Sequence, residues 1–205
     1  MYAYIILLCA VIYWNTHVAK FLLYIVGWKP LPEYMKHILR KHDRLVMVYP
    51  HTSYWDTAWM LVYRLAYPDV LSDLVFLIRP DFLYIPLFGS FLKAMGGVGA
   101  SSIKTKNGGR TRDIINTLNS RKRFHLAISP KGTIKKKDWR SGYYHIAKGT
   151  NALINVVGYD YRKGTVTMYA PQNENTTLLE RKELEPSLQH TMRQLIQRNP
   201  DNVEY

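Results

Sequence analysis

The chain has 205 residues, and an aromatic content of 13 % gives it enough apolar material for one globular domain, which excludes a disordered chain. Its single cysteine, Cys9, excludes a disulfide framework and any zinc or iron–sulfur site built from several cysteines. Lys and Arg number 28 against 15 Asp and Glu, and the formal net charge of +13 indicates a phosphate-bearing partner: a nucleic acid, an anionic membrane or a phosphorylated small molecule.

The first segment, Tyr2–Trp28, is almost entirely apolar and is interrupted near its middle by Asn15-Thr16-His17 and by Lys20. As one helix it would measure roughly 40 Å, enough to cross a hydrocarbon layer of about 30 Å. Polar groups in mid-membrane are costly, so two short helices lying in one leaflet are an alternative, and a buried core helix is a third. A cleaved signal peptide fits poorly, because no basic residue precedes the apolar run.

The residues that flank this segment favour a membrane anchor over residues 1–32, with residues 33–205 forming the remaining domain. Tyr and Trp side chains recur near the ends of the apolar run, as they do at membrane interfaces. Basic residues follow the run but none precedes it: Lys29, Lys36, Arg40 and Lys41. By the positive-inside rule, we expect a membrane protein whose catalytic domain lies on the cytoplasmic side.

The body of the chain alternates short apolar runs with helical stretches. Strands are expected over Leu45–Tyr49, Leu74–Ile78, Phe124–Ile128, Ala152–Gly158 and Thr165–Ala170. Helices are expected over Thr52–Ala66, Tyr84–Met95, Arg110–Leu118, Gly142–Lys148 and Leu184–Gln197. This order predicts an α/β fold in which helices flank a mixed β-sheet, with the active site where strands end and helices begin.

A histidine and an aspartate stand five residues apart where the first of these strands ends. His51 is expected just beyond the strand, and Asp56 in the first turn of the next helix, within reach of one imidazole nitrogen. The other nitrogen is then able to take a proton, as a histidine general base requires. An alternative needs no catalysis, because Ser53 and Asp56 also have the spacing of a helix capping box.

A glycine turn with lysines follows the third predicted strand. Its sequence is Ser129-Pro130-Lys131-Gly132-Thr133-Ile134-Lys135-Lys136-Lys137. Exposed amides at Gly132-Thr133, with lysines beside them, suit a phosphate or an oxyanion, and an ordinary basic turn is the alternative. The glycine-rich stretch 96–109 carries Lys104 and Lys106, either as a flexible rim or as a phosphate contact.

Taken in order, these motifs resemble the glycerolipid acyltransferase family, which includes the lysophosphatidic acid acyltransferases. The blocks that carry the resemblance are His51-x4-Asp56, a Gly-Gly stretch, Pro130-x-Gly132-Thr133, and finally Trp139-Arg140-Ser141-Gly142-Tyr143-Tyr144-His145-Ile146-Ala147. The resemblance covers about residues 45–163 and is closest to the smaller bacterial-type members.

The resemblance implies transfer of a fatty acyl chain from acyl-CoA or acyl carrier protein to a hydroxyl of a lysophospholipid or glycerophosphate, as in 1-acylglycerol-3-phosphate O-acyltransferases. It implies that His51 takes the proton of the attacking hydroxyl and that Asp56 orients the imidazole. Amides around Gly132 and Thr133 would bind the phosphate or the oxyanion. The acyl donor is a co-substrate, so neither a cofactor nor a metal is expected, and the other partners are membrane lipids and the acceptor.

The chain departs from the family at the presumed phosphate site. Ser101-Ser102 stand where the family has Asp-Arg, Lys131 where it has Glu, and Ile134 where it has Arg. Lys104, Lys131 and Lys135 could replace the lost cations, although Lys lacks the bidentate geometry of Arg. The alternative is a degenerate member that binds lipid or acyl carrier without turnover. A nucleic-acid module is disfavoured, because the basic residues are not interleaved with stacking aromatics in any recognisable module.

Overall fold

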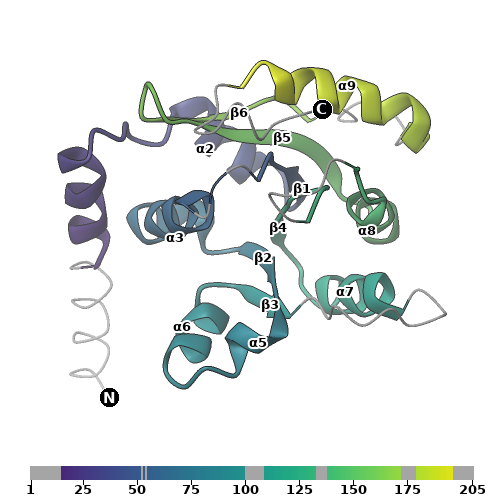
Figure 1. Cartoon of the computed structure of the whole chain (residues 1–205), viewed down its shortest axis with the longest axis horizontal. Helices are drawn as coiled ribbons and strands as arrows, with labels where there is room; N and C mark the ends of the chain where they lie inside the picture. The colour runs from purple at the N-terminus through teal and green to yellow at the C-terminus, as the bar shows by residue number, and fades with distance from the viewer. Residues whose placement is uncertain are drawn as a thin grey trace.

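The computed structural model describes residues 15–51, 53, 55–99, 109–132, 138–171 and 179–195. Within these ranges the strands are β1 (Arg44–Val48), β2 (Leu74–Ile78), β3 (Gly97–Gly99), β4 (Phe124–Ile128), β5 (Leu153–Asp160) and β6 (Thr165–Met168). The helices are α2 (Glu33–Lys41), α3 (Trp55–Ala66), α4 (Pro68–Leu71), α5 (Pro80–Leu83), α6 (Phe88–Ala94), α7 (Gly109–Asn119), α8 (Gly142–Thr150) and α9 (Arg181–Arg193). Residues 15–25 are helical as well (Figure 1).

The strands form one mixed sheet in the order β3-β2-β4-β1-β5-β6. β1 pairs in parallel with β4, where Val48 lies opposite Ile128, and with β5, where Val48 lies opposite Val156. β5 and β6 are antiparallel. Because β1 to β5 run parallel, the loops that follow their carboxyl ends lie along one edge of the sheet, where α/β proteins place their sites. The predicted α/β fold with a mixed sheet is confirmed.

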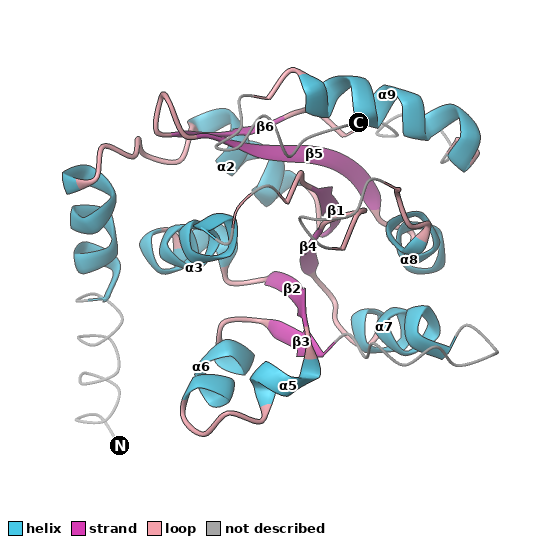
Figure 2. Cartoon of the chain, in the orientation of Figure 1, coloured by secondary structure: helices cyan, strands magenta, loops and turns pink. Residues whose placement is uncertain are grey.

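Helices cover both faces of the sheet (Figure 2). On one face α2 and α3 contribute buried side chains such as Leu39 and Tyr63. On the other face α7, α8 and α9 contribute Leu118, Tyr143 and Leu188. A fully buried leucine is worth roughly 1.5–3 kcal/mol relative to an exposed one, so each face is held by its own apolar layer.

The prediction of one helix over Tyr84–Met95 is wrong for the residues before Phe88. The chain instead forms α5, a turn, and then α6, which begins at Phe88. Pro86 has no N–H to donate, and Leu87 has a φ of 61°, so a continuous helix cannot pass through this turn. The turn leaves several large apolar side chains on the surface.

The helical residues 15–25 lie against the body of the protein (Figure 1). Ala19 and Leu23 are buried in the same core as α3. The Lys20 Nζ lies 5.3 Å from the centroid of the Tyr67 ring, which joins this helix to the end of α3. Trp28 follows the helix and packs at a tilt of 42° against Trp59 of α3, with their ring centroids 5.1 Å apart.

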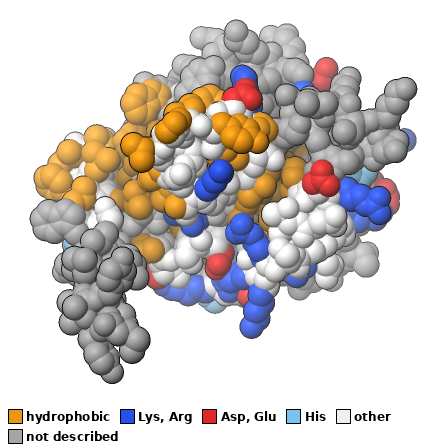
Figure 3. Space-filling view, turned by 90° about the horizontal axis from the view of Figure 1, so that it is seen from below, with side chains coloured by type: hydrophobic (Ala, Val, Ile, Leu, Met, Phe, Trp, Pro, Cys, Tyr) orange, Lys and Arg blue, Asp and Glu red, His pale blue; other side chains and the backbone are white. Residues whose placement is uncertain are grey.

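The opposite side of the helix at residues 15–25 is apolar and exposed. The exposed large hydrophobic residues of this helix are Val18, Phe21, Leu22, Tyr24 and Ile25, and the exposed Val26 follows directly after it. Figure 3 shows hydrophobic side chains over this helix and, on the same face, over α5 and α6. Across the part of the chain that the structure describes, no helix is both long enough and apolar enough to cross a membrane. The expected anchor over residues 1–32 also includes residues outside the described ranges, and its boundary at residue 32 stays a prediction.

His125 is a buried structural histidine in the middle of the sheet. Its side chain has no exposed surface, and Nε2 lies 3.0 Å from the backbone oxygen of His42, to which it donates when neutral. Burial lowers the pKa of His125, while the His42 carbonyl acts in the opposite direction. The folded chain therefore holds this imidazole neutral, whereas the unfolded chain protonates it at the ordinary histidine pKa of about 6.5.

We expect the free energy of unfolding to decrease as the pH is lowered below about 6.5, because the unfolded state then binds one more proton at His125 than the folded state does. The loss from this residue is at most about 1.4 kcal/mol for each pH unit, until the lowered pKa of the folded state is reached. Urea denaturation between about pH 7 and pH 5 measures it, with His125→Gln as the comparison. The variant should show a shallower pH dependence, and equal slopes for the two chains would contradict the prediction.

Candidate active site

The His51 loop begins at the carboxyl end of the central strand β1. The Tyr49 N–H donates to the Ile128 oxygen at 3.1 Å, so the loop leaves the sheet beside β4. The Ser53 Oγ then accepts from the Trp55 N–H at 3.2 Å, which satisfies a free amide at the start of α3. This short connection from strand to helix places Asp56 in the first turn of α3, as the sequence predicted.

His51 and Asp56 contact each other. The His51 Nδ1 lies 3.3 Å from the Asp56 Oδ2, and the side chain of Asp56 is 1 % exposed while that of His51 is 18 % exposed. Asp56 is thus shielded from water, and the imidazole reaches the surface. When Nδ1 carries the proton toward Asp56, Nε2 is the unprotonated nitrogen, which is the tautomer of a general base.

Two further donors hold the Asp56 carboxylate. The Ser53 N–H donates to Oδ2 at 3.0 Å, and the Tyr161 hydroxyl donates to Oδ1 at 2.5 Å. Asp56 therefore takes part in the capping of α3 and also contacts His51, and the catalytic role of the pair stays a prediction. Tyr161 was missed because it follows β5, more than a hundred residues away in sequence. Its only sequence signal is its position after a predicted strand.

Tyrosines make up the surroundings of the pair. Burial raises the pKa of Tyr49, and the negative charge of Asp56 raises it further. The same two causes, in the same order, raise the pKa of Tyr159. Both phenols stay neutral at physiological pH, so neither adds a negative charge beside Asp56. The Trp28 ring packs edge-on to Tyr161 with centroids 5.4 Å apart, which fixes the ring that donates to Asp56.

The glycine turn after β4 lies at the same edge of the sheet, because β4 is a neighbour of β1. Lys131 is buried, and Gly132 has a φ of 68°, a backbone conformation that glycine adopts readily. The Gly132 N–H donates to the Ser129 oxygen at 3.0 Å. A Cβ at Gly132 would lie 3.8 Å from the Arg140 Nη1, so a guanidinium neighbours the turn. Arg140 belongs to the last sequence motif, 139–147, and its positive charge is the sequence signal for a role beside this turn.

The other predicted substrate-binding residues, Lys104, Thr133 and Lys135, lie outside the described residues, and their roles stay predictions. In the part of the chain that is described, no group of three or more His, Cys, Asp and Glu side chains is arranged to hold a metal ion. The expected absence of a metal and of a cofactor is a prediction as well.

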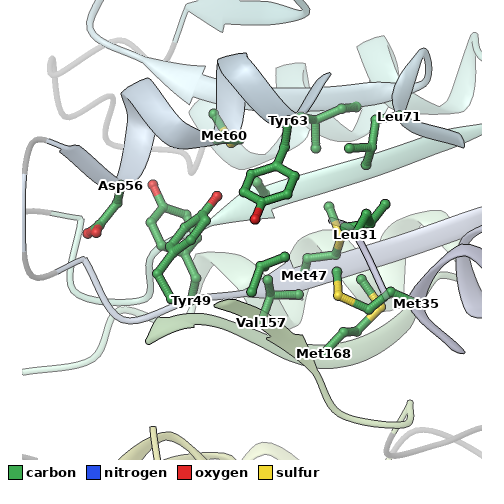
Figure 4. Close-up of a pocket in the computed structure, with 14 residues that line it drawn as sticks. Leu31, Met35, Met47, Tyr49, Asp56, Met60, Tyr63, Leu71, Val157 and Met168 are labelled. Atoms are coloured by element: carbon green, nitrogen blue, oxygen red, sulfur yellow. The ribbon is translucent and has the colours of Figure 1, made fainter. Parts of the chain in front are cut away.

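A narrow apolar cavity of about 50 Å³ extends from Asp56 into the layer between α3 and the sheet. Figure 4 shows Asp56 at one end, Tyr49 next to it, and Met35 and Met168 at the far end. The lining residues come from the loop before α2, from α2, α3 and α4 and from the sheet: Leu31, Met35, Met47, Tyr49, Asp56, Met60, Tyr63, Leu71, Leu74, Ala127, Val157, Tyr159, Val166 and Met168. Four of them are methionines, whose flexible side chains can rearrange around an apolar guest.

Comparison with protein families identifies a family for this chain. A family model described as Acyltransferase matches residues 32–168, which is more than half of the chain. No curated protein matches the sequence. The matched region runs from the residue before α2 to the end of β6, so it contains His51, Asp56, Tyr161 and the turn at Gly132.

Proposed function

Since this chain belongs to the glycerolipid acyltransferase family, we propose that it is a membrane-bound O-acyltransferase. It moves a fatty acyl chain from acyl-CoA or acyl carrier protein to a hydroxyl of a lysophospholipid or glycerophosphate, as a 1-acylglycerol-3-phosphate O-acyltransferase does. The observation that carries the proposal is the contact between a water-accessible His51 and the buried Asp56, 3.3 Å apart at the carboxyl edge of the sheet.

His51 acts as the general base. Its Nδ1–H donates to Asp56, and its Nε2 takes the proton of the acceptor hydroxyl while the hydroxyl oxygen attacks the thioester carbonyl carbon. The new C–O bond forms, the C–S bond breaks, and the departing thiolate takes up the proton held by His51. No acyl-enzyme is formed, so no nucleophilic serine or cysteine is required.

The turn at Gly132 supplies the groups that bind negative charge. Backbone amides around Gly132 and Thr133 donate to the acceptor phosphate or to the oxyanion of the tetrahedral intermediate. Lys131 at this turn, with Lys104 and Lys135, provides cations in place of the arginines that other family members carry. Arg140 lies beside Gly132 and adds a guanidinium able to bind phosphate in a bidentate manner.

The apolar cavity beside Asp56 receives the acyl chain, with the thioester near Asp56 and the end of the chain toward Met168. Its wall is formed by methionine, leucine and valine side chains, with tyrosines next to Asp56. A longer chain requires the methionines to move, because the open space accommodates only a short apolar segment.

The protein is held at a membrane by its N-terminal segment. Support comes from the exposed apolar side of the helix at residues 15–25 and from the charge of +13 on the whole chain, which favours anionic headgroups. The catalytic domain lies on the cytoplasmic side, and membrane lipids are partners of the protein. Nucleic acid is not a partner.

Acyl transfer to a panel of lysophospholipids and to glycerol 3-phosphate tests this function. The native chain in membranes is supplied with labelled acyl-CoA or labelled acyl carrier protein, and His51→Ala is the matched control. We expect label in the lipid product with the native chain, and a loss of about 10²-fold or more in the variant. Absence of transfer from both donors to every acceptor would contradict the function. Vesicle binding without transfer would then favour the degenerate family member.

A further inference from the structure

The segment between β2 and β3 exposes an unusual number of large apolar side chains. Six of them lie within ten residues and form what is called here the α5–α6 patch: Phe82, Tyr84, Ile85, Leu87, Phe88 and Phe91. Each is between 41 and 88 % exposed. α5 buries no residue, and α6 buries only Gly89 and Leu92, so most of this segment's apolar surface faces outward. Contiguous apolar surface of this kind marks an interaction site.

A tight backbone turn centred on Leu87 makes this residue the exposed tip of the α5–α6 patch. The Phe88 N–H donates to the Pro86 oxygen at 2.6 Å across Leu87, which has φ 61° and ψ −54°. This is a γ-turn of the rare, strained kind, here centred on a leucine. Leu87 is 88 % exposed, so the strain is not offset by burial of the side chain in the free protein.

The α5–α6 patch lies at the same edge of the sheet as the active site. α5 follows the carboxyl end of β2, as the His51 loop follows that of β1. A Cβ at Gly99 would lie 3.3 Å from the Leu83 Cδ1, which shows that α5 packs against the end of β3. Figure 3 shows hydrophobic side chains over α5 and α6 and over the helix at residues 15–25 on one face of the protein, with Lys and Arg side chains beside them.

We propose that the α5–α6 patch is a second membrane contact, which inserts Leu87 and its neighbours into the lipid leaflet beside the active site. A convex apolar tip suits a fluid bilayer, whereas a folded protein partner would need a matching cavity. Tyr84 is an aromatic residue of the interfacial type, and the exposed Lys93 flanks the patch where anionic headgroups would lie, whereas the exposed Arg79 is ion-paired with Asp81. The contact extends the membrane association proposed above and keeps the active site at the lipid surface.

A site-specific fluorescent label tests the insertion. In a Cys9→Ser chain, Leu87→Cys carries a polarity-sensitive fluorophore, and Lys182→Cys on the exposed side of α9 is the matched control. With vesicles of phosphatidylcholine and phosphatidylglycerol, we expect the label at 87 to shift to shorter wavelengths and to be quenched by lipid-borne quenchers. The label at 182 should not change. An unchanged label at 87 would overturn the proposal, and so would a shift that appears without vesicles and grows with protein concentration, which indicates a second copy of the chain.

A second variant separates this contact from the catalytic function. Leu87→Ser/Phe88→Ser should lower vesicle binding about tenfold or more, whereas Leu179→Ser, which removes another exposed leucine, should leave it unchanged. With a short-chain lysophospholipid below its micelle concentration, Leu87→Ser/Phe88→Ser should transfer acyl chains as the native chain does. If the native chain transfers nothing, the label and vesicle measurements still decide the proposal. Native vesicle binding by the double variant would overturn it.

Discussion

Asp56→Asn is expected to lower the acyl-transfer rate by about 10²–10⁴-fold without unfolding the protein. The Ser53 N–H and the His51 Nδ1 both contact Oδ2 of Asp56, while the Tyr161 hydroxyl donates to Oδ1. With the asparagine oxygen in the Oδ2 position both contacts are kept, and the amide group donates to the Tyr161 hydroxyl, so much of the local structure is kept. The side chain is then neutral, and it no longer stabilises the positive charge that the imidazole gains when it takes the proton of the acceptor.

Tyr161→Phe provides a graded comparison. It removes one hydrogen bond to Asp56 but leaves the carboxylate, so we expect a loss of about ten- to a hundredfold, since a hydrogen bond to a charged group is worth about 1.5–3 kcal/mol. Transfer rates are measured with saturating donor, and the thermal midpoint of each variant serves as the folding control. A folded Asp56→Asn chain with at least a tenth of the native rate would contradict the role given to His51 and Asp56.

The strands buried on both faces were predictable because they are continuous apolar runs. β2 and β4 have the predicted bounds, Leu74–Ile78 and Phe124–Ile128. β3 was not predicted, since Gly97–Gly99 contains one apolar side chain and is a strand only through its pairing with β2. α2 was missed as well, because its nine residues are mostly polar and only Met35 and Leu39 are buried.

In the active site, only the contact between residues that are close together in the sequence was predictable. His51 and Asp56 are joined by one strand-to-helix turn, so their spacing was enough to predict the contact. The hydrogen bond from Tyr161 depends on the register between β5 and β1 and on the packing of Trp28, which no local pattern encodes. The γ-turn at Leu87 likewise depends on tertiary structure, although Pro86 could have ruled out the continuous helix.

The far end of the apolar cavity should set the length of the acyl chain. Met168 lies there, on β6, and Met168→Ala removes three heavy atoms from the wall. Each methylene group newly buried is worth about 0.8 kcal/mol, so three of them favour the longer donor by about 2 kcal/mol. The ratio of kcat/KM for a long donor to that for one three carbons shorter should then rise by up to about thirtyfold.

Met192→Ala is the matched control for this prediction. Met192 is equally buried, but it belongs to α9 on the other face of the sheet and does not line the cavity. Both variants should lose about 2–5 kcal/mol of folding free energy, as expected when a buried methionine is truncated. Only Met168→Ala should change the preference for donor length, because only there does the lost volume adjoin the cavity. An equal change in both variants, or in neither, would show that the acyl chain is bound elsewhere.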